Sequence, residues 1–324
     1  MTLTERNFRP RLGQGELPDL TDYMTVSDRD FQRAAELWNA RMPEAYQDLL
    51  YAEVVGDDDG VPLFAVIDKG DWRWLQRSYR YRNTRTKEVI GDAKWTDLRD
   101  DFTDALYPDV EEVSADLVDR TITVHEYLRR MARLIRLGHC ASWLFGCGGY
   151  NRLRPEAVLS LEDTLRTQLS YLRSFGVDII NQNRTDRQGH DPLFGIALDV
   201  PRIPLRPPRP TPVPAATEIP TTPITDRGLV NRGVMYVEAM TASAEKARST
   251  TYHPHPDILP NYPGDGSTLC LSRCRCHWQF IFPRGQDSFY HAYWRLRGHH
   301  PDGKNCATCL EYNRRYNPYT VTRF

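Results

Sequence analysis

The sequence predicts a mainly helical α+β protein. We expect an antiparallel helical module and a small, β-hairpin-rich cysteine module, joined by a proline-rich extended tether. Three observations carry this prediction. Apolar residues recur at helical spacing between Trp95 and Gln182, nine prolines lie between Pro201 and Pro223, and five of the seven cysteines lie between Cys270 and Cys309. A chain of 324 residues is long enough for two or three domains.

The N-terminal part predicts a flexible arm over residues 1–26 and a small α/β region over residues 27–90. Ser27 followed by Asp30 is a variant of the capping box, so we expect a helix to begin there. Pro43 ends that helix and can begin a second one. The later segment VPLFAVIDKGDWRWLQRSYRYR predicts a β-hairpin with its turn at Lys69 and Gly70, because aromatic and polar residues alternate after the turn.

Residues 91–185 predict a helical bundle module. Its first part is one long helix, or two helices that meet at Pro108. Thr123 and Glu126 form a capping box at the start of the next helix, and the GCGG sequence at 146–149 ends it. A third helix begins at Pro155. Helices with short connections pack antiparallel, so a bundle is the expected arrangement.

A proline-rich extended linker is predicted over residues 186–227, followed by a helix and a cysteine-rich module over residues 228–324. The stretch from Pro201 to Pro223 is expected to form neither a helix nor a central strand. At about 3.1 Å per residue it would span about 70 Å when fully extended. So long a tether is unusual in a compact enzyme, and it suits an assembly protein that reaches a distant neighbour.

The cysteines near the C-terminus predict a metal site. Cys274 and Cys276 on a strand would point to one side, and Cys306 and Cys309 have the two-residue spacing of a zinc knuckle. With Cys270 these are five candidates for the four ligands of a tetrahedral Zn²⁺. The histidines close enough in sequence to act as spare ligands are His277, His299 and His300. Disulfides and unligated thiols are the alternatives to zinc. A module of about 60 residues is only marginally stable on hydrophobic burial alone, so a metal or disulfide cross-link has a physical reason to exist.

A second candidate site is a basic stripe at helical spacing. It consists of Arg129, Arg130, Arg133 and Arg136. The formal net charge of −1 provides no global attraction to DNA, so any contact with nucleic acid requires a local patch. The stripe is either such a contact, to DNA phosphate or to an acidic partner surface, or simply a solvated helix face.

Several function classes find no support in the sequence. The first residues do not form a signal peptide, and no apolar run is long enough to cross a membrane, so synthesis in the cytoplasm and no membrane partner are expected. The GCGG sequence lacks the Lys-Ser/Thr pair of a phosphate-binding loop. No nucleophile elbow, zincin helix or Cys–His dyad occurs. We therefore expect that the protein is not an enzyme.

Three segments have a distinctive sequence: WRWLQRSYRYRNTRTKEVI, the helical stretch from ITVHEYLRRM to TQLSYLRSF, and PGDGSTLCLSRCRCHWQF. In this order they resemble minor structural proteins of tailed phages, in particular the phage Mu F-like head morphogenesis, or minor head, family. The segment GHHPDGKNCATCLEYNRRY resembles the companion CxxC segment of that family. In the relatives the CxxC segment comes first, whereas here Cys306 and Cys309 follow the other three cysteines. This reversal leaves open which four of the five cysteines are ligands.

The resemblance implies a virion structural protein, located in the capsid interior or at the portal vertex and made in the host cytoplasm. Its partners would be the portal protein, the major capsid protein or packaged DNA, with multiple copies in one assembly. It would act in head assembly and in DNA packaging or ejection. The alternative from a different class is a zinc-dependent nucleic-acid-binding protein that acts in packaging or ejection, supported by the arginine stripe and the basic tether.

Overall fold

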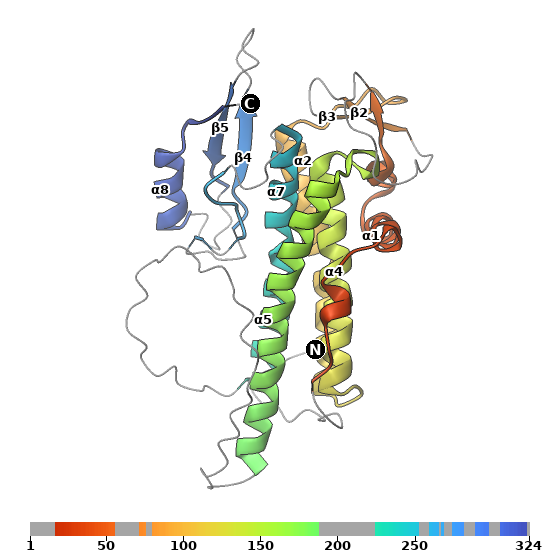
Figure 1. Ribbon diagram of the computed structural model, residues 1–324, viewed down its shortest axis with the longest axis vertical. Helices are drawn as coiled ribbons and strands as arrows, with labels where there is room; N and C mark the ends of the chain where they lie inside the picture. The colour runs from red at the N-terminus through yellow and green to blue at the C-terminus, as the bar shows by residue number, and fades with distance from the viewer. Residues whose placement is uncertain are drawn as a thin grey trace.

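The computed structural model describes residues 17–55, 71–75, 80–187, 224–252, 259–265, 267–268, 274–281, 289–297 and 305–322. It confirms the predicted fold class, because the described chain is mainly helical and carries two small sheets. A group of long helices forms the body of the molecule, and the C-terminal sheet with its helix lies beside one end of that body (Figure 1).

The helices are α1 (Asp28–Arg41), α2 (Asp92–Asp104), α3 (Tyr107–Val118), α4 (Val124–Cys147), α5 (Pro155–Arg187), α6 (Asp226–Glu238), α7 (Met240–Tyr252) and α8 (Ala307–Arg315). Short 3-10 turns occupy Thr21–Tyr23, Glu44–Tyr46, Leu49–Tyr51 and Tyr150–Arg152. The strands are β1 (Glu53–Val55), β2 (Trp72–Leu75), β3 (Arg80–Asn83), β4 (His277–Ile281), β5 (Phe289–Arg295) and β6 (Tyr319–Thr322). One sheet has the order β1-β2-β3 and the other the order β4-β5-β6.

Local signals placed the expected helix ends correctly. The Asp30 carboxylate accepts a hydrogen bond from the backbone N–H of Ser27 at 3.0 Å, which fixes the start of α1. At the start of α4 the Thr123 hydroxyl accepts from the backbone N–H of Glu126 at 3.2 Å. The same helix ends at Gly148, whose φ of 100° lies in the left-handed region that favours glycine. Pro108 lies in the first turn of α3, so the sequence after Trp95 forms two helices.

Two local expectations were wrong. The helix expected after Pro43 is replaced by two 3-10 turns and strand β1, since the carbonyls of Ala45 and Tyr46 accept hydrogen bonds from the Trp72 and Trp38 indoles. The single strand expected after Gly70 forms two antiparallel strands, β2 and β3. The first strand and the turn of that expected hairpin lie outside the described residues.

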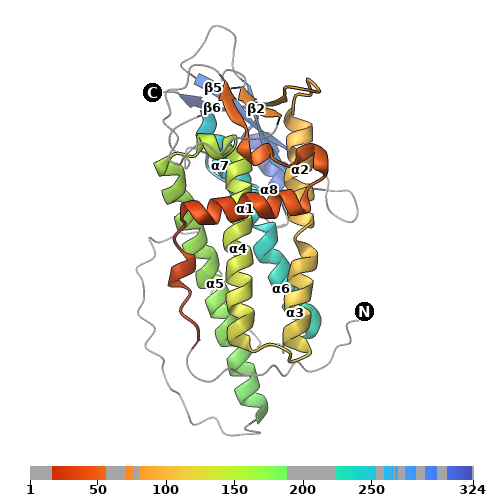
Figure 2. The same cartoon turned by 90° about the vertical axis from the view of Figure 1, so that its right-hand side faces the viewer.

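The body of the molecule has one apolar core that runs from Leu20 to Ala247. Helix α4 lies at its centre and packs against α1, α5 and α7, and α1 runs across it (Figure 2). The most extensive of these contacts is that between α4 and α7. A Cβ added at Gly146 would lie 2.3 Å from the carbonyl oxygen of Ala244, so only glycine lets the two backbones come so near.

This packing changes the expected organisation of the chain. The segment from 228 onward was expected as one helix of the cysteine module. It forms the two helices α6 and α7, and both contribute to the core of the bundle. Ten residues of the expected N-terminal arm are described, and Leu20 among them is buried in the same core. Most of the proline-rich linker, residues 188–223, lies outside the described residues.

The C-terminal sheet has a separate core. Trp278 and Trp294 face each other on β4 and β5 with ring centroids 5.3 Å apart, and Tyr312 and Tyr316 of the α8 region pack beside them. The backbone of Trp278 is turned toward α7, where its N–H donates to the Glu245 carboxylate at 3.3 Å. The sheet therefore meets the helical body through the edge of β4.

Candidate metal centre

Three of the predicted cysteine ligands lie together in the C-terminal module. Cys274 and Cys276 lie directly before β4, and Cys309 lies in the first turn of α8. Their sulfur atoms are all within 4.8 Å of one another, and the three side chains are buried. The Sγ atoms of Cys274 and Cys309 are 3.5 Å apart. A strand start and a helix start, 33 residues apart in sequence between Cys276 and Cys309, thus form one site.

These distances suit a shared metal ion. A Zn–S bond of about 2.3 Å in a tetrahedral site places the sulfurs about 3.8 Å from each other. A disulfide requires about 2.05 Å, and none of the six described cysteines forms one. The cluster could therefore bind a metal such as zinc, and the disulfide alternative finds no pair at bonding distance among the described cysteines.

Local backbone geometry explains why the three thiols converge. Side chains alternate along an extended segment, so Cys274 and Cys276 point to the same side as the buried Trp278. Cys306 is the N-cap of α8, and its sulfur accepts a hydrogen bond from the backbone N–H of Cys309 at 3.4 Å. The same turn therefore brings the Cys306 sulfur beside the backbone of Cys309.

The same site resists ionisation when it holds no cation. Hydrogen bonds with Cys274 and Cys276 raise the pKa of the Cys309 thiol, and burial raises it further. A bound divalent cation reverses this effect, because a coordinating thiol loses its proton. The arrangement is therefore chemically suited to a metal ion and poorly suited to three thiolates without one.

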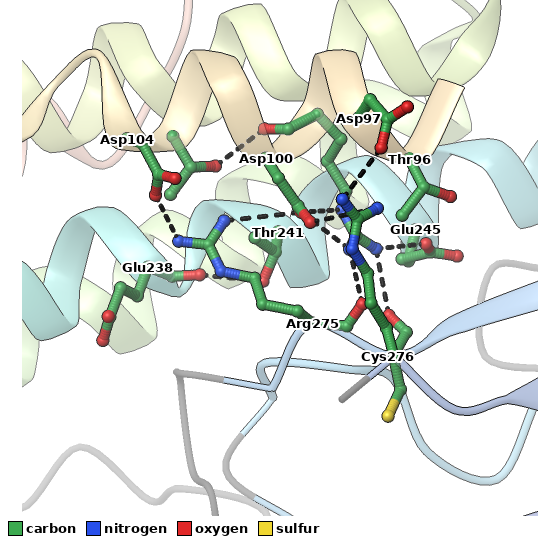
Figure 3. A network of polar contacts seen from close by, with 12 residues as sticks. Thr96, Asp97, Asp100, Asp104, Glu238, Thr241, Glu245, Arg275 and Cys276 are labelled. Atoms are coloured by element: carbon green, nitrogen blue, oxygen red, sulfur yellow. Dashed lines mark hydrogen bonds and ion pairs between the residues drawn. The ribbon is translucent and has the colours of Figure 1, made fainter. Parts of the chain in front are cut away.

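A buried arginine fastens the cysteine segment to the helical body. Arg99 of α2 is fully buried and donates hydrogen bonds to the carbonyl oxygens of Arg275 (2.9 Å) and Cys276 (3.1 Å). It also forms ion pairs with Asp100 at 2.8 Å and with the fully buried Glu245 of α7. Figure 3 shows Asp100 and Glu245 on the two helices, facing the segment that carries Arg275 and Cys276.

Further arginines of the C-terminal module extend this contact. Arg275, between two of the candidate ligands, pairs with Asp104 at 2.6 Å and donates to the Tyr107 hydroxyl at 2.8 Å. Arg297 pairs with Asp97 at 2.8 Å. From α7, Arg248 forms an ion pair with Asp92. The acidic side of α2 thus receives arginines from the module, and the metal-ligand segment lies in the interface.

Nothing in the sequence singled out Arg99 and Glu245, whose charged side chains are fully buried in this interface. Their separation of 146 residues carries no spacing signal, and both stand in helices where a charged side chain is ordinarily solvated. Burial raises the pKa of Glu245, although the charges of Arg99 and Arg248 oppose that rise. A buried carboxylate in this position depends on its arginine partner for its charge.

Among the described residues, the other predicted ligands, His277 and Cys306, are not members of the cluster. His277 alternates to the opposite side from Cys276, and burial together with the charges of Arg99 and Arg248 lowers its pKa to about 3. Cys270, His299 and His300 lie outside the described residues. Cys306 is half-buried and adjoins the cluster through its contact with Cys309.

The structure separates the members of the predicted arginine stripe on α4. Arg129 and Arg133 are exposed, and within the described residues neither forms an ion pair. Arg130 pairs with Asp116 and Glu126. Arg136 pairs with Asp30 at 2.9 Å and stacks over the Tyr23 ring. Two of the four arginines are therefore held by partners within the protein.

Comparisons with known proteins found no match to a family model, to a curated protein or to a solved structure. Among the described residues, no helix combines the length and the apolar character that a membrane crossing requires.

Proposed function

We propose that this protein is a structural component of a tailed-phage virion, a minor head protein near the portal vertex, and that its cysteine centre holds a structural zinc ion. The resemblance of three sequence segments to phage minor head proteins supports the virion role. The observation that carries the structural zinc is the buried thiol cluster, which lies in the interface between two modules. On this proposal the protein acts in head assembly, with the portal or major capsid protein as its neighbour.

The proposed zinc ligands are Cys274, Cys276, Cys309 and Cys306. The first three are already within 4.8 Å of one another. Cys306 is the fourth because its sulfur lies at the same helix start as Cys309, in the turn of a zinc knuckle. Cys270 is the competing fourth ligand from sequence spacing.

A structural task for the metal fits the surroundings of the site. A catalytic zinc keeps one coordination position open for water or substrate, whereas four thiolates close the site. The zinc would join the start of β4 to the start of α8. The carbonyls of Arg275 and Cys276, which Arg99 binds, belong to the same segment. Loss of the metal should therefore loosen the module and its contact with α2 together.

The remaining described cysteines support a role without thiol chemistry. Burial raises the pKa of Cys140 well above its usual range and that of Cys147 to about 12. Both lie in the core of α4. Thiols in such surroundings are inert toward nucleophilic chemistry.

Metal analysis of the purified protein tests the zinc proposal. We expect about one zinc per chain, and Cys306→Ser should lower the zinc affinity while Cys147→Ser leaves it unchanged. Less than a tenth of an equivalent of zinc, together with oxidised thiols, would refute it in favour of disulfides. Loss of affinity in Cys270→Ser but not in Cys306→Ser would reassign the fourth ligand.

The virion role requires a separate test. Mass spectrometry of purified phage particles should find the protein at a fixed ratio to the portal protein, and tagged protein should co-purify with portal or major capsid protein. Deleting its gene should leave cells that accumulate defective heads. Particles of normal composition and infectivity without the protein would contradict the proposal, whatever the zinc result.

A further inference from the structure

The C-terminal sheet has one face that its own core leaves uncovered. The buried face carries Trp278, Phe280, Tyr290 and Trp294, as the alternating burial along β4 and β5 shows. The opposite face is partly exposed, and Ile281 there is 41% exposed. Its members are His277, Gln279 and Ile281 on β4, Phe289, His291, Tyr293 and Arg295 on β5, and Thr320 and Thr322 on β6. We call it the aromatic face. Its His277 and Gln279 end lies against α2, where Gln279 donates a hydrogen bond to Asp92 at 3.4 Å.

Ring side chains form a continuous row along β5 on the aromatic face. The ring centroids of Phe289 and His291 are 5.2 Å apart, and those of His291 and Tyr293 are 6.4 Å apart. The guanidinium of Arg295 lies 4.8 Å from the centroid of the Tyr293 ring. His291 is held across the sheet by a hydrogen bond between its Nδ1 and the Thr320 hydroxyl at 3.1 Å. Neighbouring strands thus fix the row in place.

The charge of this part of the chain differs from that of the whole protein. Strands β4, β5 and β6 contain no aspartate or glutamate. Residues 267–324 contain nine arginines and lysines and three acidic residues, a formal charge of +6 in a chain with a net charge of −1. Two of those arginines, Arg314 and Arg315, are exposed in the last turn of α8. Arg275 and Arg297 are paired with aspartates of α2, and the other seven basic residues against three acidic ones still leave the module with a net positive charge.

We propose that the aromatic face binds single-stranded nucleic acid, with unstacked bases on the rings of Phe289, His291 and Tyr293 and phosphates near Arg295. Base–aromatic stacking beside a positively charged surface is how proteins hold single strands without sequence preference. A duplex buries the faces of its bases, so a row of rings on a sheet selects single strands over duplexes. The strands themselves carry no carboxylate, and the Asp92 carboxylate beside Gln279 is ion-paired with Arg248, which suits a polyanion.

This site is distinct from the arginine stripe on α4. On α4, Arg130 and Arg136 form ion pairs with acidic residues of the protein itself. Arg129 and Arg133 are exposed, and within the described residues neither stacks on an aromatic ring. The inference does not depend on the virion role, because it rests only on the chemistry of the sheet. A single-strand site would add a nucleic-acid contact to the module that the zinc centre stabilises.

Fluorescence anisotropy with the full-length, zinc-loaded protein and a labelled single-stranded DNA of about 20 nucleotides tests the proposal, since that length exceeds what one small domain covers. We expect binding that weakens as salt rises. Tyr293→Leu should weaken it about ten-fold or more, whereas Tyr293→Phe, which keeps the ring, should bind as the wild type does. Tyr171→Leu is the matched control, since Tyr171 is 59% exposed on α5.

Each variant is compared at equal zinc content and thermal stability. Phe289→Leu, at the start of β5, removes a second ring of the aromatic face. If Tyr293→Leu does not fold, this variant still tests the proposal. The proposal would be overturned if the wild type did not bind the single strand at protein concentrations up to about 100 μM, the range of ordinary non-specific binding. It would also be overturned if the leucine variants bound the single strand as tightly as the wild type does. A duplex that competes as well as the single strand would be the third contrary result.

Discussion

Replacing Arg99 with methionine should destabilise the protein more than replacing any of its surface arginines. The change removes the ion pair to Glu245 and the two hydrogen bonds to the carbonyls of Arg275 and Cys276. Glu245 is fully buried, and it would keep only the charge of Arg248 as compensation. Breaking a buried pair in this way costs about 3–5 kcal/mol. At about 2–3 °C per kcal/mol for a chain of this size, the midpoint of thermal unfolding should fall by roughly 6–15 °C.

The loss of stability in Arg99→Met should also depend on pH in a defined direction. Burial already raises the pKa of Glu245, and removing the opposing charge of Arg99 raises it further. A carboxyl group with a folded pKa above its unfolded value stabilises the fold when protonated, and that stability is lost as pH rises through the folded pKa. Arg99→Met should therefore be closer to the wild type near pH 5 than near pH 8.

A double-mutant cycle separates the ion pair from the loss of packing. Arg99→Met combined with Glu245→Leu removes both charges, and a buried pair replaced by apolar side chains is often neutral in stability. We expect the double variant to be more stable than Arg99→Met alone. Differential scanning fluorimetry and urea unfolding at constant zinc concentration measure this. Surface substitutions usually change the free energy of unfolding by no more than about 0.5 kcal/mol. An Arg99→Met variant within that range of the wild type would show that Arg99 is not a buried anchor. Strictly additive effects of the two substitutions would show that Arg99 and Glu245 do not interact.

Three other substitutions test single positions. Gly146→Ala should lower the free energy of unfolding by about 1–3 kcal/mol, because the new Cβ would clash with the Ala244 carbonyl. Gly91→Ala is the control for the same unfolding assay and should lower it less, because nothing lies within 4 Å of the added Cβ. Thr123→Ala should cost about 1 kcal/mol through loss of the α4 cap, and an unchanged urea midpoint would argue against that cap. Cys274→Ser should abolish stoichiometric zinc binding; retention of a full equivalent of zinc by this variant would remove Cys274 from the ligand set.

The parts of the fold that could be predicted from sequence depend on short-range contacts. The starts of α1 and α4 were predicted correctly because their capping bonds join residues three apart. The same holds for Cys306 and Cys309, whose spacing alone places them in one helical turn. The prediction failed in residues 44–51, where the carbonyls of Ala45 and Tyr46 accept hydrogen bonds from the indoles of Trp72 and Trp38, 27 and 8 residues away, which no local pattern indicates.

The mainly helical class, the starts of α1 and α4 and the division of the cysteines into two half-sites follow from residues close together in the sequence. The packing of α7 against α4, the meeting of Cys274, Cys276 and Cys309, and the contact of Arg99 with their segment follow from the tertiary structure. Whether a charged side chain is buried depends on which elements pack around it. Arg99 and Arg129 each follow a buried leucine on a helix, and only the fold makes one a buried anchor and the other a solvated side chain.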